Sequence, residues 1–169
     1  AFYSVATDNV GHQESAPAFG DATTTMPAVG RLLFYNNSAL DAGGDDDAAI
    51  AGDKVALLPG QTADSINYTG YSRGINGIMV DIDELDAAYT PVADDFDFKV
   101  SDPPVPGGWT DGPVPTLTVR ASEGVGESDR VTLVWPDGAI VDQWVEVTVK
   151  SDANGGSLGL ADDDVFYFG

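Results

Sequence analysis

Short runs of β-branched and aromatic residues recur along the chain, and turn-forming residues bound each run. Within Trp144–Lys150, the residues Val145, Val147 and Val149 alternate with polar or larger side chains, which is the two-residue period of a strand with one face on a core. Such runs predict eight strands. Their ranges are Arg31–Tyr35, Lys54–Leu58, Gly77–Ile82, Phe96–Val100, Thr116–Arg120, Arg130–Trp135, Trp144–Lys150 and Val165–Phe168.

Helical periodicity is nearly absent, and only Asp83–Tyr89 has the composition of a helical turn. The turn sequence Pro-Asp-Gly in WPDGAI separates two of the expected strands. Proline presets φ and glycine accepts a left-handed conformation, so this segment predicts an antiparallel hairpin between Arg130–Trp135 and Trp144–Lys150.

About eight or nine strands separated by turns predict an all-β fold, a β-sandwich with either jelly-roll or immunoglobulin-like topology. A chain of 169 residues suits a single domain spanning residues 1–169. The proline-rich segment Ser101–Val114 is compatible with a linker between two subdomains. Trp109 at its middle favours the alternative, a loop that packs on the body.

The strongly negative net charge of the chain excludes some classes of binding partner. The chain has 28 acidic and 7 basic residues and a formal net charge of -21, so it repels phosphate backbones and anionic lipid, and neither nucleic acid nor a membrane surface is expected as a partner. No apolar run approaches the length of a membrane span, so membrane insertion is not expected either. The absence of cysteine and the single histidine, His12, exclude thiolate and multi-histidine metal sites.

Aspartates and asparagines crowd the stretch from residue 36 to residue 53. Carboxylates so close together raise one another's pKa and oppose folding unless a cation intervenes, and Ca²⁺ prefers such oxygen ligands. We therefore expect a structural Ca²⁺ site. Its candidate ligands are Asn37, Asp41, Asp45, Asp46, Asp47 and Asp53. The alternative is a solvated acidic loop with Lys54 and Arg31 nearby, and adaptation to salty water also accounts for an excess of acids.

Two further pairs of acids lie at i and i+2 on expected strands, Asp81 with Asp83 and Asp95 with Asp97. Each pair is expected to form the solvent side of its strand, and metal binding is the alternative. No G-x-S-x-G nucleophile motif is present, and pairs of carboxylates are too common in this chain to indicate hydrolysis, so an enzyme is not expected.

Aromatic side chains are the second group of residues that could form a binding site. Protein sites for sugars use flat rings together with a few polar groups, and the surface of a β-sandwich is a suitable scaffold. The candidate carbohydrate-binding residues are Trp109, Tyr68, Tyr71, Arg73 and Asn76. Trp135 and Trp144 are instead expected in the core, and covering a core edge is the alternative role for Trp109.

Several phrases resemble a module of large secreted, multi-modular bacterial proteins, often found near dockerin-like repeats. The phrases are LLFYNNSALD, DDAAIAGDKVALLPGQTA, NYTGYSRGINGIMVDI, SDRVTLVWPDGAIVDQWVEVTV and GLADDDVFYFG. The likeness covers residues 31–169 and leaves residues 1–30 outside. It implies an extracellular or cell-surface accessory module and carries no catalytic residue. The residues that it places in the family's acidic loop are Asn36, Asn37, Asp41, Asp46, Asp47 and Asp53. The segment AGGDDD is more compact here than the family's pattern.

The expected function is that of a secreted, calcium-stabilised accessory module that binds a polysaccharide or a cell-surface glycan. The alternative is a structural or adhesive subunit of an extracellular assembly, in contact with neighbouring modules or with copies of itself.

Overall fold

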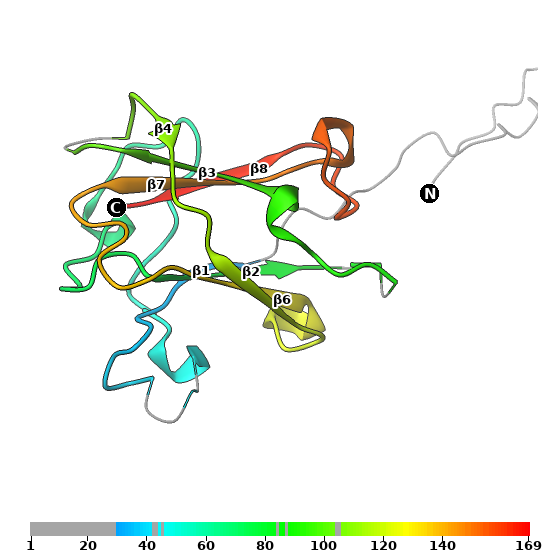
Figure 1. Ribbon diagram of the computed structural model, residues 1–169, viewed down its shortest axis with the longest axis horizontal. Helices are drawn as coiled ribbons and strands as arrows, with labels where there is room; N and C mark the ends of the chain where they lie inside the picture. The colour runs from blue at the N-terminus through cyan, green and yellow to red at the C-terminus, as the bar shows by residue number, and fades with distance from the viewer. Residues whose placement is uncertain (1–29, 42–43, 45, 84, 87, 104–105) are drawn as a thin grey trace, which may run out of the picture.

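Two antiparallel four-stranded sheets pack face to face in the computed structural model, which describes residues 30–41, 44, 46–83, 85–86, 88–103 and 106–169. The first sheet has the order β1-β2-β6-β5 and the second the order β4-β3-β7-β8. Figure 1 shows them as two layers. The strands are β1 (Gly30–Leu33), β2 (Gly77–Ile82), β3 (Phe96–Ser101), β4 (Thr110–Asp111), β5 (Thr116–Arg120), β6 (Asp129–Val134), β7 (Trp144–Val149) and β8 (Asp164–Phe168).

The strand order is immunoglobulin-like. When the eight strands are named A, B, C, C′, D, E, F and G in chain order, the sheets read A-B-E-D and C′-C-F-G. The expected all-β sandwich is therefore confirmed. The described residues also form five short 3₁₀ turns: η1 (Asp46–Ala49), η2 (Ser65–Asn67), η3 (Ala93–Asp95), η4 (Val125–Glu127) and η5 (Asp152–Asn154). In the described part of the chain, no helix is long and apolar enough to span a membrane.

The main hydrophobic core lies between the sheets and is formed by alternate residues of β2, β3, β6, β7 and β8. Each of these side chains is at most 8% exposed, and burying one fully stabilises the fold by roughly 1.5–3 kcal/mol. The first sheet contributes Ile78, Val80, Ile82, Val131 and Leu133, and the second contributes Phe96, Phe98, Val100, Val145, Val147, Val149, Phe166 and Phe168.

The expected hairpin between β6 and β7 is wrong. β6 belongs to the first sheet and β7 to the second, so the intervening residues 135–143 cross from one layer to the other. Trp135 and Ile140 are buried in the core at 0% and 1% exposure, and Nε1 of Trp135 donates to the carbonyl of Pro113 (2.7 Å). This burial holds the crossing in place, although the sequence has the turn residues of a hairpin.

Three other segments differ in part from their predicted secondary structure. Lys54–Leu58 forms no strand and makes a single bridge, between Leu57 and Tyr167 of β8, because the amide of Val55 bonds the carbonyl of Ile66 instead (2.9 Å). The residues described between 83 and 89 form turns rather than a helix. The proline-rich segment contains β4, and the ring of Trp109 stacks on Tyr167, so this segment packs on the body.

The outer face of the first sheet is covered as well. Every residue of β2 is buried, and the side chain of Met79 packs in a small second cluster with Phe34 and Ala49. A bridge between Phe34 and Ile50 returns the chain alongside β1. The acidic loop (residues 36–53) therefore lies on the side of the first sheet that faces away from the second (Figure 1, blue to cyan).

Candidate functional site

The acidic loop closes at its base through backbone hydrogen bonds. The amide of Tyr35 donates to the carbonyl of Ala49 (3.0 Å), and the amide of Ala51 donates to the carbonyl of Leu33 (2.8 Å). Apolar residues thus set the two ends of the loop, and the aspartates are carried between them. Residues 42, 43 and 45 lie outside the described residues, and the expected ligand Asp45 is among them.

Asp47 binds two arginines of the first sheet. Arg120 of β5 donates to both of its carboxylate oxygens (3.0 and 2.5 Å), and Nη1 of Arg130 of β6 lies 3.1 Å from Oδ1. The hydrogen bonds from Arg120 hold the pKa of Asp47 below its ordinary value, against the opposing effect of burial. Protein cations therefore satisfy this carboxylate. The expected neighbour Arg31 instead binds Asp164 at the other end of the chain.

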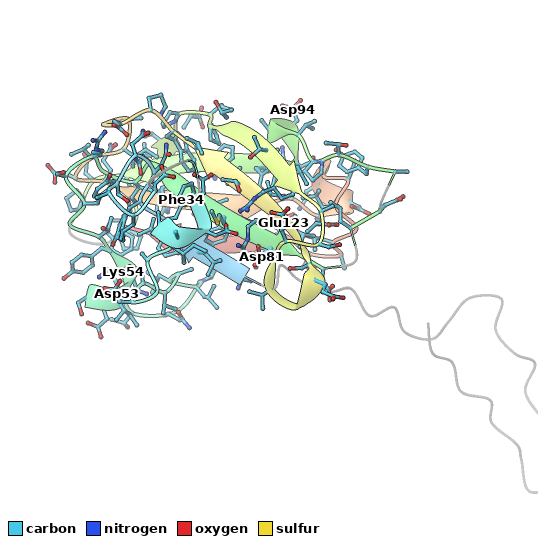
Figure 2. All side chains as sticks on the ribbon, turned by 90° about the horizontal axis from the view of Figure 1, so that it is seen from below. Phe34, Asp53, Lys54, Asp81, Asp94 and Glu123 are labelled. Atoms are coloured by element: carbon cyan, nitrogen blue, oxygen red, sulfur yellow. The ribbon has the colours of Figure 1, made fainter. Side chains whose placement is uncertain are left out.

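Arg130 also binds Asp81, its cross-strand neighbour. The two groups form a fork-to-fork pair (2.7 and 2.8 Å), and the amide of Val125 donates to the same carboxylate (2.9 Å). Asp81 is 0% exposed, so the expectation that it faces solvent is wrong, because β2 is covered on both faces. Arg120 extends the network to Glu123 (3.0 Å), and Figure 2 shows Glu123 near Asp81.

The second pair of acids was also expected to face solvent, and this is wrong for Asp95, which is 2% exposed. Its carboxylate accepts hydrogen bonds from the hydroxyl of Tyr89 (2.9 and 2.8 Å) and from the amides of Val92 (2.8 Å) and Ser157 (3.1 Å). Asp97 is exposed as expected and lies 3.4 Å from Nζ of Lys150.

The carboxylates of Asp41 and Asp46, two of the predicted metal ligands, interact with each other. One oxygen of Asp41 accepts the amide of Asn37 (2.8 Å), and the other is buried without a hydrogen-bond partner. Burial, and next the negative charge of Asp41, raise the pKa of Asp46. The repulsion between two neighbouring carboxylates is reduced when one of them is protonated or when both bind the same cation.

The side chains of Asn37 and Asp53, two further predicted ligands in the described residues, have partners outside this pair. The side chain of Asp53 is 74% exposed and lies 3.2 Å from Nζ of Lys54. Figure 2 shows Asp53 and Lys54 at one edge of the molecule, well away from Asp81 and Glu123. The side-chain amide of Asn37 donates to Asp137 (3.1 Å). Within the described ranges, no three acids or histidines are grouped closely enough to hold a metal ion.

A cleft of about 600 Å³ lies at the end of the sandwich where residues 68–75 meet the crossing before β7. In Figure 1 this end carries the C mark and the orange segment that leads into β7. The volume falls in the range of about 300–1,000 Å³ that is usual for small-molecule sites. The lining residues are Tyr68, Thr69, Gly70, Tyr71, Ser72, Gly74, Ile75, Pro103, Ile140, Val141, Asp142, Gln143, Trp144 and Gly169.

Aromatic rings from two segments line the cleft. Tyr68 is 49% exposed, and its ring meets the ring of Trp144 edge to face, with centroids 6.4 Å apart. Tyr71 is fixed from behind, because its ring packs on Tyr35 (4.8 Å) and its hydroxyl donates to the carbonyl of Asn36 (3.1 Å). The cleft thus combines one exposed ring with two whose positions are set by packing.

Arg73 and Asn76 support the cleft from behind its lining. The side-chain amide of Asn76 donates to the carbonyl of Asn36 and to Asp137 (2.8 Å each), and Arg73 forms an ion pair with the same Asp137. The hydrogen bond from Asn76, and next that from Arg73, lower the pKa of Asp137. Neither residue lines the cleft, so their donors serve the protein itself.

Trp109 lies elsewhere, among residues of the second sheet. Its ring is half-buried and stacks on Tyr167 of β8, with centroids 5.3 Å apart and an interplanar angle of 16°. It does not line the cleft. The structure therefore brings Tyr68 and Tyr71 together in one cleft and separates Trp109 from them.

Sequence reasoning missed several residues that line the cleft: Ile140, Val141, Asp142 and Gln143 of the crossing, and Trp144 at the start of β7. They were assigned to a hairpin turn and a core strand. Val141 is 45% exposed and Trp144 only 4%. The available signal in the sequence was an apolar residue in a polar turn, three positions before the first residue of a strand.

Comparisons of the chain with protein-family models, with curated proteins and with solved structures found no significant match.

Proposed function

We propose that this protein is a carbohydrate-binding accessory module, rather than an enzyme, and that its glycan lies in the cleft beside Tyr68. The observation that carries the proposal is the exposed ring of Tyr68 held edge-on against Trp144 at the rim of an open cleft. An exposed tyrosine in a concave apolar site is suited to stacking on the C–H face of a pyranose.

The polar side chains of the lining support the same function. Thr69, Ser72, Asp142 and Gln143 offer hydroxyl, amide and carboxylate groups around the rings. Such groups hydrogen-bond to sugar hydroxyls, while the apolar residues bury the carbon skeleton. In this proposal Arg73 and Asn76 act indirectly, by holding residues 71–76 against Asp137 and Asn36.

Affinity electrophoresis against a panel of polysaccharides, followed by calorimetry with oligosaccharides, tests the proposal. We expect Tyr68→Ala to remove binding, because half of the side chain is exposed and its loss spares the core. Trp109→Ala is the matched control, since it deletes a half-buried aromatic ring outside the cleft. If Trp109→Ala abolishes binding and Tyr68→Ala does not, the glycan lies on the second sheet and the proposal for the cleft is wrong.

Calcium stabilisation is the second element of the proposal. The paired carboxylates of Asp41 and Asp46, with one buried oxygen of Asp41 lacking a partner, support a cation between them. Oxygen ligands of this kind suit Ca²⁺. In this proposal Asp47 and Asp53 are not ligands, because Asp47 pairs with arginines and Asp53 lies beside Lys54. The resemblance of the sequence to modules of secreted proteins supports the further proposal that the module works outside the cell or on its surface.

The alternative function is a structural or adhesive unit, and one observation favours it. β5 is the terminal strand of the first sheet, and in the described structure it pairs only with β6. A five-residue edge strand of this kind can accept a strand from another molecule. Multi-angle light scattering at native salt tests this alternative, which predicts multimers, whereas a monomer at high concentration counts against it.

A further inference from the structure

The charge of the cleft lining is negative. Among the described residues that line it, Asp142 is the one with an acidic or basic side chain. Asp102 adds a second carboxylate near the rim, because Nε2 of Gln143 lies 3.5 Å from its Oδ1. The nearest guanidinium in the network behind the lining, that of Arg73, is neutralised by its ion pair with Asp137. An anionic ligand therefore meets carboxylates here and no unpaired cation of the lining.

Asp142 has an uncommon backbone conformation. Its φ is +51°, in the left-handed region that non-glycine residues seldom adopt and in which Asp and Asn are the most tolerated. The side chain is exposed, between the apolar Val141 and the amide of Gln143. A carboxylate has two oxygens that accept hydrogen bonds and no donor, so it matches two neighbouring hydroxyl groups of one sugar ring.

We propose that the cleft selects uncharged sugars: the carboxylate of Asp142 accepts hydrogen bonds from two adjacent hydroxyls, and sugars that carry carboxylate or sulfate groups are rejected. This inference rests on the proposed glycan binding and adds the class of ligand. The chain's net charge of -21 acts in the same direction over a longer range, but salt screens it strongly.

Calorimetry with matched oligosaccharides tests the selectivity. The neutral probes are the hexasaccharides of cellulose, β-1,3-glucan, xylan and mannan, and the anionic probes are the cellulose hexasaccharide oxidised at its primary hydroxyls and hexagalacturonate. We expect a neutral probe to bind at least about tenfold more tightly than any anionic one at low salt. About 1 M NaCl, where the Debye length is about 3 Å, should narrow the gap without closing it, since Asp142 and the ligand are in contact.

Asp142→Asn identifies the residue responsible. Asn keeps the shape and tolerates the left-handed backbone, but it exchanges one acceptor oxygen for a donor. We expect the affinity for the neutral probe to fall by about tenfold and the affinity for the anionic probes to rise. Asp162→Asn is the control, because it removes the same unit of charge at an exposed position outside the lining, and it should change neither affinity.

The outcomes separate the two proposals. If no probe binds the wild type or either variant, the proposed glycan site itself is wrong. If neutral and anionic probes bind the wild type equally, or if Asp162→Asn shifts the selectivity as much as Asp142→Asn, the module binds glycans but the assignment of selectivity to Asp142 is overturned.

Discussion

Arg130 and Asp81 form a fork-to-fork ion pair on the outer face of the first sheet, at 2.7 and 2.8 Å, with side chains 7% and 0% exposed. They face each other across β2 and β6, and Gly124 passes so close that a Cβ there would lie 2.8 Å from Cγ of Asp81. This pair links the sheet to the acidic loop, because Arg130 also binds Asp47.

Asp81→Asn should destabilise the protein by about 3–5 kcal/mol, since it leaves the buried Arg130 without its principal counterion. Urea unfolding measures the change. Asp97→Asn is the control, and it should cost no more than about 1 kcal/mol because Asp97 is largely exposed beside Lys150. The double variant Asp81→Leu with Arg130→Met should recover much of the loss. Equal effects of the two single variants would contradict this account.

Asp46→Asn should stabilise the protein at neutral pH in the presence of chelator. The pKa of Asp46 is raised in the folded state, so its protonated form favours folding below the unfolded value of about 3.9, and this contribution is lost as pH rises through the folded pKa. The gain over wild type should therefore appear above about pH 4 and vanish below it. Thermal unfolding across pH, with Asp162→Asn as a control, measures the profile.

Asp47 titrates in the opposite sense. Its folded pKa is lowered by Arg120, so its stabilising contribution is present above the unfolded value of about 3.9 and is lost as pH falls through the folded pKa. Asp47→Asn should therefore destabilise the protein at neutral pH, and its difference from wild type should shrink towards pH 2–3. A difference that grew as pH fell would contradict the ion pair.

Calcium should raise the unfolding temperature of the wild type and should not change the unfolding temperature of the Asp46→Asn variant. A ligand that binds only the folded state stabilises it by mass action, and for a chain of this size each kcal/mol corresponds to about 2–4 °C. Scanning calorimetry in chelator and in excess Ca²⁺ gives the comparison. Asp53→Asn should respond to Ca²⁺ as the wild type does, since Asp53 lies with Lys54. The absence of any shift in the wild type would refute the calcium proposal.

Gly77→Ala should destabilise the fold by about 1–3 kcal/mol through overpacking. A Cβ at Gly77 would lie 2.5 Å from Cε1 of Phe34, a ring that fixes the start of the acidic loop. Gly52→Ala is the matched control, because a Cβ there meets nothing within 4 Å, and its effect should stay within about 0.5 kcal/mol. A similar loss for both would show that the contact with Phe34 does not matter.

Most strand positions followed from the sequence. β2 and β5 have the predicted bounds, β3, β7 and β8 differ by one residue at one end, and β6 begins and ends one residue earlier than predicted. The two-residue alternation of β-branched residues identified these strands, because it is a local property that any apolar core requires. The two-residue β4 escaped notice because so short a strand carries no period.

The partners of each strand and of each charge were decided by the tertiary structure. The alternation within a strand shows which of its faces is apolar, but it does not show to which of the two sheets the strand belongs. The turn residues after β6 therefore predicted a hairpin. Burial of Trp135 and Ile140 instead leads the chain across to the second sheet. Asp47 meets Arg120 from 73 positions away, and Tyr68 meets Trp144 only because residues 68 and 144 border the same end of the sandwich. The chain thus encodes its strands locally, whereas its ion pairs and cleft arise from long-range packing, which no local pattern records.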